Sequence, residues 1–451
     1  MFKTLKNAWG IPDLRKKLMF TLLILLIYRI GNVIPVPFVN GDSLTAYFNT
    51  ALSGTVFQMM NTFAGQGLST ASLLALGIQP YINSSIIIQL LTIAIPALER
   101  WAKEEGEEGK KKINMLTRIA TVVLGLIMGF AYYMMLASNA GILEENNFWV
   151  ALVIILTFTA GSTAVMWLGE QITEHGIGNG ISMILFANII GGLPSGIRTM
   201  SQLFTAKSWW IPVLAGILMA ALIVFVVFIN DAERRIPIQY AKRVVGRKVY
   251  GGQSTNMPIK VAMSGVMPVI FAQSICSLPA TIMSFFGITA ASKNWWYDNL
   301  FSPNCWVYIV FYGLMIFFFS WFYASIQYDP VEIANNLKKN GGFIPGFRPG
   351  KPTADFIKKV IAKIVIFGAV YLAVVALLPI ISGNIFTSFV HAKFAITDAA
   401  YQAVSGLAIG GTSVIIVVGV ARETVKALEA QMLMRHYKGF LDLLKSRRGA
   451  G

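Results

Sequence analysis

Residues 149–168 read WVALVIILTFTAGSTAVMWL, twenty residues without one charged side chain. An α-helix of that length rises about 30 Å, which matches the thickness of the hydrocarbon core of a bilayer. A helix that is apolar on every side needs either lipid or a large protein interior around it. Similar runs recur from one end of the chain to the other, so we expect an all-α polytopic membrane protein.

The composition of the whole chain agrees with this fold class. Of 451 residues, 55% are hydrophobic and only 13% are charged, whereas an ordinary soluble domain carries about a quarter charged residues. The apolar runs predict ten membrane spans, at residues 18–38, 72–95, 115–137, 149–168, 181–200, 210–230, 260–285, 306–325, 360–380 and 400–421.

Lysine and arginine are distributed unevenly between the loops of this topology. With the N-terminus placed in the cytoplasm, the cytoplasmic segments carry 30 of these residues and the external loops carry four. Because cytoplasmic loops of membrane proteins are enriched in Lys and Arg, the split predicts an even number of spans with both termini inside. The net charge of +16 is then explained by topology rather than by nucleic-acid binding.

Two cytoplasmic loops are too long to be simple turns. Residues 230–260 alternate apolar and polar side chains around 235–240 and again around 244–250, a pattern that predicts a β-ribbon. The loop at 326–359 contains the stretch ANNLKKNGGFIPGFRPGKPT (334–353), rich in Gly, Pro and basic residues. Long loops of this kind often carry function, although basic loops that only enforce topology would look similar.

An external segment precedes the second predicted span. Residues 54–95 are too long for one crossing, and Gly65-Gln66-Gly67 provides a natural break. We therefore predict a short half-helix that folds back toward the bundle from outside. An amphipathic helix lying on the outer leaflet is the alternative.

No motif for chemistry is evident in the sequence. It lacks the phosphate-binding loop, the HExxH pair and the GxSxG elbow, and its two cysteines predict no disulfide framework. We expect no catalytic residue, metal or cofactor, so energy must come from a partner. Acidic residues avoid the middles of the spans, which argues against an ion-coupled transporter. Arg29, inside the first predicted span, should face the bundle interior. A channel, a transporter and an intramembrane enzyme remain the alternatives at this point.

Seven stretches, in order along the chain, resemble signatures of the SecY family. They are ALGIQPYINSSIIIQLLT (75–92), EEGEEGKKKINMLTR (104–118), GIGNGISMILFANIIGGLP (176–194), RRIPIQYAKRVVGRKVYGGQST (234–255), GVMPVIFAQSI (265–275), the 334–353 stretch quoted above and GGTSVIIVV (410–418). The ending RHYKGF (435–440) resembles the Gram-positive branch.

The resemblance implies a fold and a function. Ten helices would form two inverted five-helix halves, 1–200 and 201–430, around a central hourglass pore, followed by a cytoplasmic tail at 431–451. Such a protein is a channel rather than an enzyme. It translocates unfolded secretory polypeptides across the bacterial plasma membrane and releases membrane segments laterally into lipid.

The resemblance also implies site residues. A pore ring of six aliphatic side chains would be closed from outside by a plug at about 55–68, and a lateral gate would open between the second–third and seventh–eighth spans. Spacing alone would assign the ring pairs at i and i+4 to ordinary packing. The ring is Ile82, Ile86, Leu185, Ile189, Ile270 and Ile416; the plug includes Phe57, Met60, Phe63 and Gly65; the gate carries Gln89, Thr92, Gln273 and Ser274.

The implied partners are other proteins and lipid. The family suggests the SecE and SecG subunits, the motor ATPase SecA, the ribosome and preproteins that bear signal peptides. The two basic loops and the tail would dock the motor and the ribosome through Arg243, Arg247, Lys248, Arg348 and Tyr437. Arginine suits docking because its planar group binds carboxylates and phosphates through two hydrogen bonds.

Overall fold

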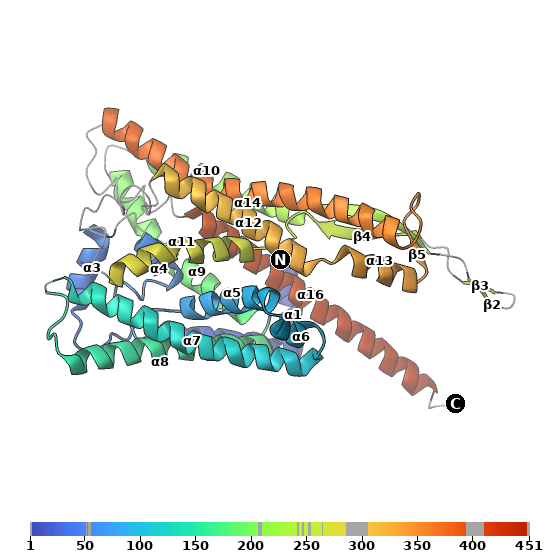
Figure 1. Ribbon diagram of the computed structural model, residues 1–451, viewed down its shortest axis with the longest axis horizontal. Helices are drawn as coiled ribbons and strands as arrows, with labels where there is room; N and C mark the ends of the chain where they lie inside the picture. The colour runs from blue at the N-terminus through green and yellow to red at the C-terminus, as the bar shows by residue number, and fades with distance from the viewer. Residues whose placement is uncertain are drawn as a thin grey trace.

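The computed structural model describes residues 2–448, with the exception of 51, 53–55, 140, 206–209, 241–242, 246–247, 251–253, 264, 286–304 and 394–409. Long helices lie side by side in one bundle, and a narrow β-ribbon projects from one end of it (Figure 1). We call this end the ribbon end. The polytopic helical fold class expected from the sequence is confirmed.

The first nine predicted spans each contain a helix. The tenth, predicted at 400–421, begins outside the described residues, and its described part belongs to a helix. The helices are α2 (Pro12–Gly31), α5 (Gln79–Ala94), α7 (Gly106–Ala137), α8 (Phe148–His175), α9 (Gly180–Thr205), α10 (Trp210–Asp231), α11 (Met267–Phe285), α12 (Trp306–Gln327), α14 (Lys351–Lys393) and α16 (Gly410–Arg448).

Length and hydropathy alone qualify fewer of these helices as membrane spans. Among the described residues, α7, α8, α12 and α14 each contain an apolar stretch long enough to cross a bilayer. Helix α5 and the short α6 (Pro96–Lys103), bent by 107° at their junction, add a fifth candidate, and α9, α10 and α11 contain shorter apolar helices. Of the other helices in the predicted spans, α2 carries basic residues near both ends, and α16 is charged beyond residue 421.

The first two predicted spans were wrong at their boundaries. Helix α2 ends at Gly31, well before residue 38, so Arg29 lies in the last turn of the helix rather than at mid-span. The second span does not begin at 72, because residues 64–78 form turns and α5 starts only at Gln79. Positive φ angles at Gly65, Gln66, Ala71 and Gly77 interrupt the helix there. Hydropathy could not detect this interruption because the turns are themselves apolar.

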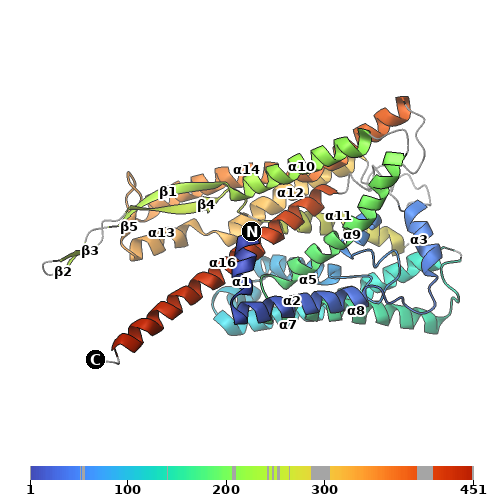
Figure 2. The same cartoon turned by 180° about the vertical axis from the view of Figure 1, so that it is seen from behind.

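Packing places the helices in two groups that touch along two edges. Helices α5, α7 and α8 are neighbours, α11, α12 and α14 are neighbours, and α2 lies along α8 (Figure 2). Helix α11 contacts α5 and α7 on one side of the molecule, and α9 contacts α16 and α10 on the other. The space enclosed between α5, α9, α11 and α16 is therefore the centre of the bundle.

The apolar turns at 64–78 pack directly against the bundle. A Cβ atom on Gly161 of α8 would lie 1.9 Å from the carbonyl oxygen of Leu73. Only glycine permits this approach of backbone to backbone. The tyrosine hydroxyl of Tyr132 in α7 donates a hydrogen bond to the carbonyl of Leu68. These contacts hold the chain close to the centre of the bundle between α4 (Val56–Phe63) and α5.

The outer surface of the bundle is apolar. On α2, Leu22, Leu23 and Leu26 are each more than half exposed, and on α12 the exposed side chains include Leu314 and Trp321. Exposed apolar faces of this extent require lipid around them. Large side chains also fill the interior, including the fully buried Tyr28, Phe158, Tyr312 and Phe319. The chain is therefore a membrane-embedded multi-pass protein.

The β-ribbon predicted in the 230–260 loop is confirmed. Strand β1 (Glu233–Tyr240) pairs antiparallel with β4 (Ser254–Lys260), and β2 (Arg243–Val245) pairs with β3 (Lys248–Tyr250) beyond them. Ile236 and Ile238 are buried at alternate positions of β1, as the period of two requires. The sequence did not indicate that β5 (Gly342–Phe343), from the second loop, would pair with the end of β1.

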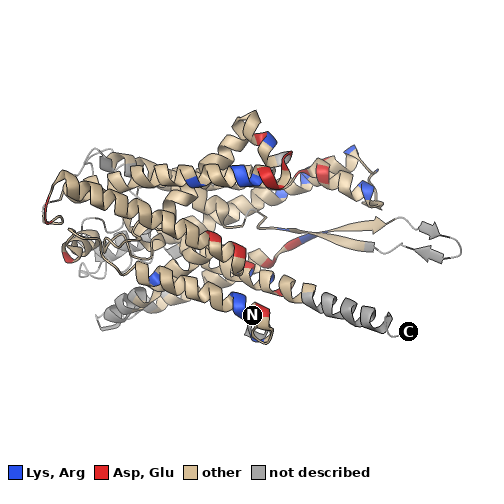
Figure 3. Cartoon of the chain, turned by 90° about the horizontal axis from the view of Figure 1, so that it is seen from below, with Lys and Arg blue, Asp and Glu red and all other residues tan. Residues whose placement is uncertain are grey.

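Charged side chains gather toward the ribbon end, while the opposite half of the bundle is nearly free of them among the described residues (Figure 3). The ribbon end carries the strands, α13 (Pro330–Lys339), the N-terminal α1 (Phe2–Trp9) and the distal part of α16 (Figure 1). Helix α3 (Gly41–Thr50) and α4 lie away from it. The two ends of the molecule therefore differ in charge.

Candidate functional site

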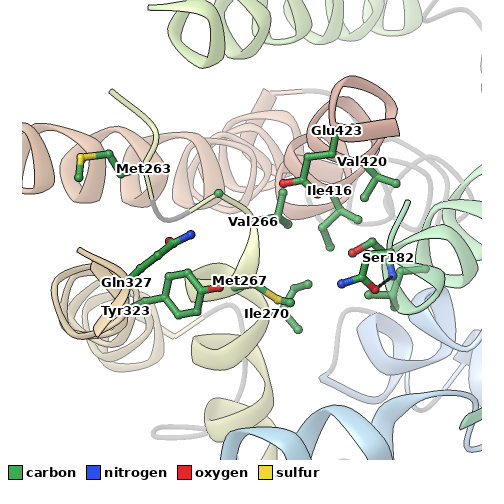
Figure 4. Close-up of a pocket in the computed structure, with 13 residues that line it drawn as sticks. Ser182, Met263, Val266, Met267, Ile270, Tyr323, Gln327, Ile416, Val420 and Glu423 are labelled. Carbon is green, nitrogen blue, oxygen red and sulfur yellow. Dashed lines mark hydrogen bonds between the residues drawn. The ribbon is translucent and has the colours of Figure 1, made fainter. Parts of the chain in front are cut away.

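A cavity of about 190 Å³ opens between α9, α11, α12 and α16. Figure 4 shows Ser182, Met267, Tyr323 and Glu423 around it. Because α9 and α11 begin at the ribbon end and α12 finishes there, this wide cavity faces that end of the bundle. Its polar lining side chains also include Asn179 and Gln327.

A much smaller cavity lies next to the wide one, farther from the ribbon end. Its volume is about 10 Å³, which is room for about one water molecule. Leu185, Ile270 and Ile416 line both cavities, so these three side chains form the wall between them. The wall comes from three helices, α9, α11 and α16, and it is entirely apolar. The remaining lining residues of the small cavity are Phe63, Gln79, Ile82, Gln273 and Ser274.

Four members of the predicted ring, Ile82, Leu185, Ile270 and Ile416, therefore surround one small space. The other two, Ile86 on α5 and Ile189 on α9, lie one helical turn farther along and are also buried. At this level the space enclosed by the helices narrows from the wide, polar-lined cavity to a constriction that is lined without charged side chains. This is the shape of an hourglass waist.

Helix α4 lies against the small cavity on the side away from the ribbon end. Its Phe57 and Phe63 side chains are buried, and Phe63 reaches the small cavity at the ring. Met60 and Phe63 also line a second cavity of about 10 Å³ with Leu68, Ile78 and Met128. A short helix, α4, is present in the predicted segment, and positive φ at Gly65 marks the break after it. Residue 55, the first of the predicted plug, lies outside the described residues.

The seam where α5 meets α11 is held by a hydrogen bond that the sequence analysis missed. Gln79 Nε2 donates to the Ser274 hydroxyl at 3.3 Å, and the neighbouring Gln273 is buried. The other two predicted gate residues lie farther along α5, where Gln89 is exposed and the Thr92 hydroxyl donates to the carbonyl of Gln89 at 2.7 Å. Gln79 precedes Pro80 at the start of α5, and no local sequence signal marks it as a contact between helices.

The predicted docking residues are spread over the ribbon end. Arg243 begins β2 and Lys248 begins β3, in the hairpin that projects farthest from the bundle (Figure 1). Arg247 lies outside the described residues, and Tyr437 belongs to the distal turns of α16.

The second loop presents Arg348 on a fixed support. Ile344 is buried beneath the ribbon, and the Phe347 ring packs on Phe356 with 4.3 Å between the ring centres. Thr353 donates its hydroxyl to the Arg348 carbonyl at 2.8 Å. The Arg348 side chain itself is exposed. Its backbone is therefore ordered while its charge remains available.

Basic side chains also gather where α16 leaves the bundle. Arg422 pairs with Asp231 at the end of α10. Burial, together with the neighbouring cations Lys260 and Arg422, lowers the pKa of Lys426. Lys260, Arg422 and Lys426 therefore place positive charges near one another where α16 leaves the bundle.

Two cavities separated by an apolar waist, inside a bundle with a lipid-facing surface, define a membrane channel. Comparison with known proteins then gives the family: the SecY family model matches residues 72–425, and the chain belongs to the SecY family. It is a subunit of a protein translocation channel.

Curated relatives match the chain over its full length. Protein translocase subunit SecY of Bacillus subtilis is 42% identical over 454 residues, covering 98% of this chain and 100% of the relative. The same subunit of Streptomyces scabiei is 40% identical over 455 residues with the same coverage. The predicted likeness to Gram-positive relatives is confirmed.

Solved structures share the fold at lower identity. The structure of a protein conducting channel aligns with a TM-score of 0.63 at 17% identity, covering 92% of both chains. A second, from work stating that the plug domain of the SecY protein stabilises the closed state of the translocation channel and maintains a membrane seal, aligns at 0.62 and 16%, with 92% coverage of both. Sec61 in the canine ribosome-channel complex from the endoplasmic reticulum aligns at 0.58 and 14%, again with 92% coverage of both.

Proposed function

We propose that unfolded secretory polypeptides cross the bacterial plasma membrane through the centre of this bundle, entering at the ribbon end. The observation that carries the proposal is the apolar wall of Leu185, Ile270 and Ile416 between the two cavities. The ribbon end and both termini are then cytoplasmic, as the distribution of Lys and Arg predicts. The chain acts as two halves, 1–200 and 201–430, with the pore between them and a tail at 431–451.

The waist works by its lack of polar groups. An apolar constriction that admits about one water molecule resists hydration and therefore resists ions. It also offers a passing polypeptide no hydrogen-bond partner, so it favours no particular sequence. Ile82, Ile86 and Ile189 extend the same apolar surface along the pore. Chain translocation requires these side chains to move apart, and no catalytic step or cofactor is involved.

Helix α4 is the plug of the resting channel. Phe63 fills the waist from the side away from the cytoplasm, while Phe57 and Met60 anchor the helix among apolar neighbours. The protein in the second channel comparison is said to use its plug domain to seal the membrane. A plug in this chain would leave the waist when a polypeptide enters and return after it has passed.

The seam between α5 and α11 is the lateral gate. Only neutral polar groups, Gln79 and Ser274, form the described hydrogen bond across it, and such bonds between membrane helices contribute about 1 kcal/mol each. A hydrogen bond of this strength can break when an apolar segment competes for the seam. Gln89, Thr92 and Gln273 would contribute polar groups along the same path. Signal sequences and membrane segments would leave through it into lipid.

The loops at the ribbon end would bind the machinery that delivers the polypeptide. Arg348 in the second loop, and Arg243 and Lys248 on the projecting hairpin, fit docking of the motor ATPase SecA and of the ribosome, with Tyr437 in the distal turns of α16. Arg247, outside the described residues, would contribute to the same docking. The Sec61 relative is described in a ribosome-channel complex. Binding of basic loops to ribosomal RNA would weaken as salt rises. SecE and SecG would complete the membrane assembly.

The test is transport of a secretory preprotein into proteoliposomes that contain this chain with its SecE partner, supplied with SecA and ATP. We expect ATP-dependent protection of the preprotein from added protease. Arg348→Glu should abolish protection, whereas Lys339→Glu, an equal charge change on the exposed end of α13, should preserve it.

The outcomes separate the two parts of the proposal. Protection that survives Arg348→Glu keeps the channel and refutes the role of Arg348. If the preprotein is not protected although the protein is folded and SecA is active, the proposed channel function is refuted. The transporter alternative would then be favoured.

A further inference from the structure

We propose that Arg29, Asn32 and Asn188 form a latch that holds the plug in the waist and sets how often the channel opens without a substrate. We call these three side chains the carbonyl latch. The inference rests on the proposed role of α4 as the plug. It assigns to α2 and α9 a gating function that their apolar packing alone would not require.

The latch grips the C-terminal end of α4 through backbone carbonyls. Asn188 Nδ2 donates to the Phe63 carbonyl at 2.6 Å. Asn32 Nδ2 donates to the carbonyls of Ala64 and Gly65 at 3.1 and 2.9 Å. Arg29 Nη1 donates to the same Gly65 carbonyl at 3.4 Å. Three consecutive carbonyls at the end of one short helix therefore receive donors from two other segments.

The three donor side chains are of the kinds that stabilise the C-terminal end of a helix. The last carbonyls of a helix have no partner within the helix and carry its partial negative charge. A cation and two amide groups complement that charge, and the donors lie 32 to 125 residues away in sequence. Because the donors are not part of α4, movement of its C-terminal end away from α2 and α9 would break these bonds.

Arg29 and Asn32 are themselves held in place. Arg29 Nη2 donates to the Gly191 carbonyl at 3.2 Å, so one guanidinium ties α2 and the plug to α9. The Ser72 hydroxyl donates to Asn32 Oδ1 at 2.9 Å, which fixes the amide with its nitrogen toward the plug. A side chain fixed in this way loses little entropy when the plug returns.

Three glycines make room for the latch. A Cβ on Gly65 would lie 2.6 Å from Asn188 Oδ1, one on Gly67 would lie 2.2 Å from Asn32 Oδ1, and one on Gly191 would lie 2.3 Å from Arg29 Nη2. Gly65 also has a φ of 65°, which side chains rarely adopt. Backbone and donors are therefore fitted to one another at the plug's end.

The latch should be tested by ion conductance without any preprotein. The complete assembly, this chain with its SecE partner, would be reconstituted in planar bilayers. Losing one donor to a buried carbonyl should raise the open fraction about tenfold, given the cost of leaving such an acceptor unpaired. We therefore expect Asn188→Leu, which removes the side-chain donor of the Phe63 carbonyl, to increase the resting conductance about tenfold while transport of the preprotein continues. Arg29→Met should increase it by a smaller factor, because the Gly65 carbonyl keeps its bond from Asn32.

The matched control is Asn139→Leu. Asn139, just past the end of α7, also donates its amide to a carbonyl at a helix end, that of Met135 in the last turn of α7, away from the plug. The control should leave the resting conductance unchanged. Should Asn188→Leu fail to fold, Asn32→Leu and Gly191→Ala test the same contacts from the other two sides.

A plug deletion, removing residues 57–63, separates the possible failures. A leaking deletion together with a silent Asn188→Leu and a silent Arg29→Met would overturn the latch and leave the plug in place. A silent deletion would overturn the plug itself, and the latch with it. Equal leakage from Asn139→Leu would show that the effect is general loosening of the bundle, which also overturns the latch.

Discussion

Truncating Phe63 to alanine should open the resting channel. The Phe63 side chain is 8% exposed and lines the small cavities on both sides of the plug. Phenylalanine-to-alanine changes at buried sites cost about 3–5 kcal/mol. The truncation also changes the free energy of the displaced plug, so only part of this cost favours opening. We therefore take the lower end, about 3 kcal/mol, as the change in the free energy of opening. This corresponds to about a hundredfold rise in the open fraction.

The assay is the resting conductance of the reconstituted assembly, with Phe148→Ala as the control. Phe148 is 75% exposed at the start of α8, so its truncation removes the same atoms without opening the waist. Conductance of Phe63→Ala should exceed that of wild type by about two orders of magnitude. Conductance indistinguishable from that of Phe148→Ala would refute the placement of Phe63 as the seal.

A double-mutant cycle makes the same test quantitative. Phe63 and Ile416 line one cavity, and residues in contact show coupling energies of about 0.5–3 kcal/mol. We expect Phe63→Ala and Ile416→Ala to be non-additive in this range. Strict additivity would show that the two side chains do not touch in the resting channel, and would contradict the structure at its centre.

Three further predictions concern the waist, the packing and the seam. Ile416→Asn should hydrate the constriction and raise ion conductance during translocation, whereas Ile416→Leu should not; equal conductance of the two in bilayer recordings would argue against gating by dewetting. Gly161→Ala should reduce the yield of folded protein, because its Cβ would overlap the Leu73 carbonyl, while Gly216→Ala, which meets no atom within 4 Å, should be neutral when melting in detergent is compared. Gln79→Leu should loosen the seam by about 1 kcal/mol and increase crosslinking of signal peptides to lipid; unchanged crosslinking would count against the gate.

Features that depend on local sequence were predictable. The length of the apolar runs indicates membrane helices, the Lys and Arg distribution predicts the topology, and the period of two located the β-ribbon at 235–240. The Gly65-Gln66-Gly67 break located the end of α4. Each of these signals is written within one segment, where helix length, charge and backbone freedom act directly.

The ring and the plug were named only through a family resemblance, since the i and i+4 spacing of Ile82 and Ile86 is equally typical of ordinary packing. The structure brings Leu185, Ile270 and Ile416 together from three helices. No periodicity within one span could have selected them, because every span is apolar on most of its faces.

The sequence by itself determined the fold class and located the helical segments, and its Lys and Arg distribution predicts which loops are cytoplasmic. The tertiary structure alone decided which helices meet, where α2 and α5 end, and that β5 joins β1. It also revealed the contacts of Gln79 with Ser274 and of Asn188 with Phe63. The physical reason is that lipid solvates all apolar faces equally, so hydrophobicity places a helix in the membrane without choosing its neighbours. Close packing and a few buried hydrogen bonds make that choice.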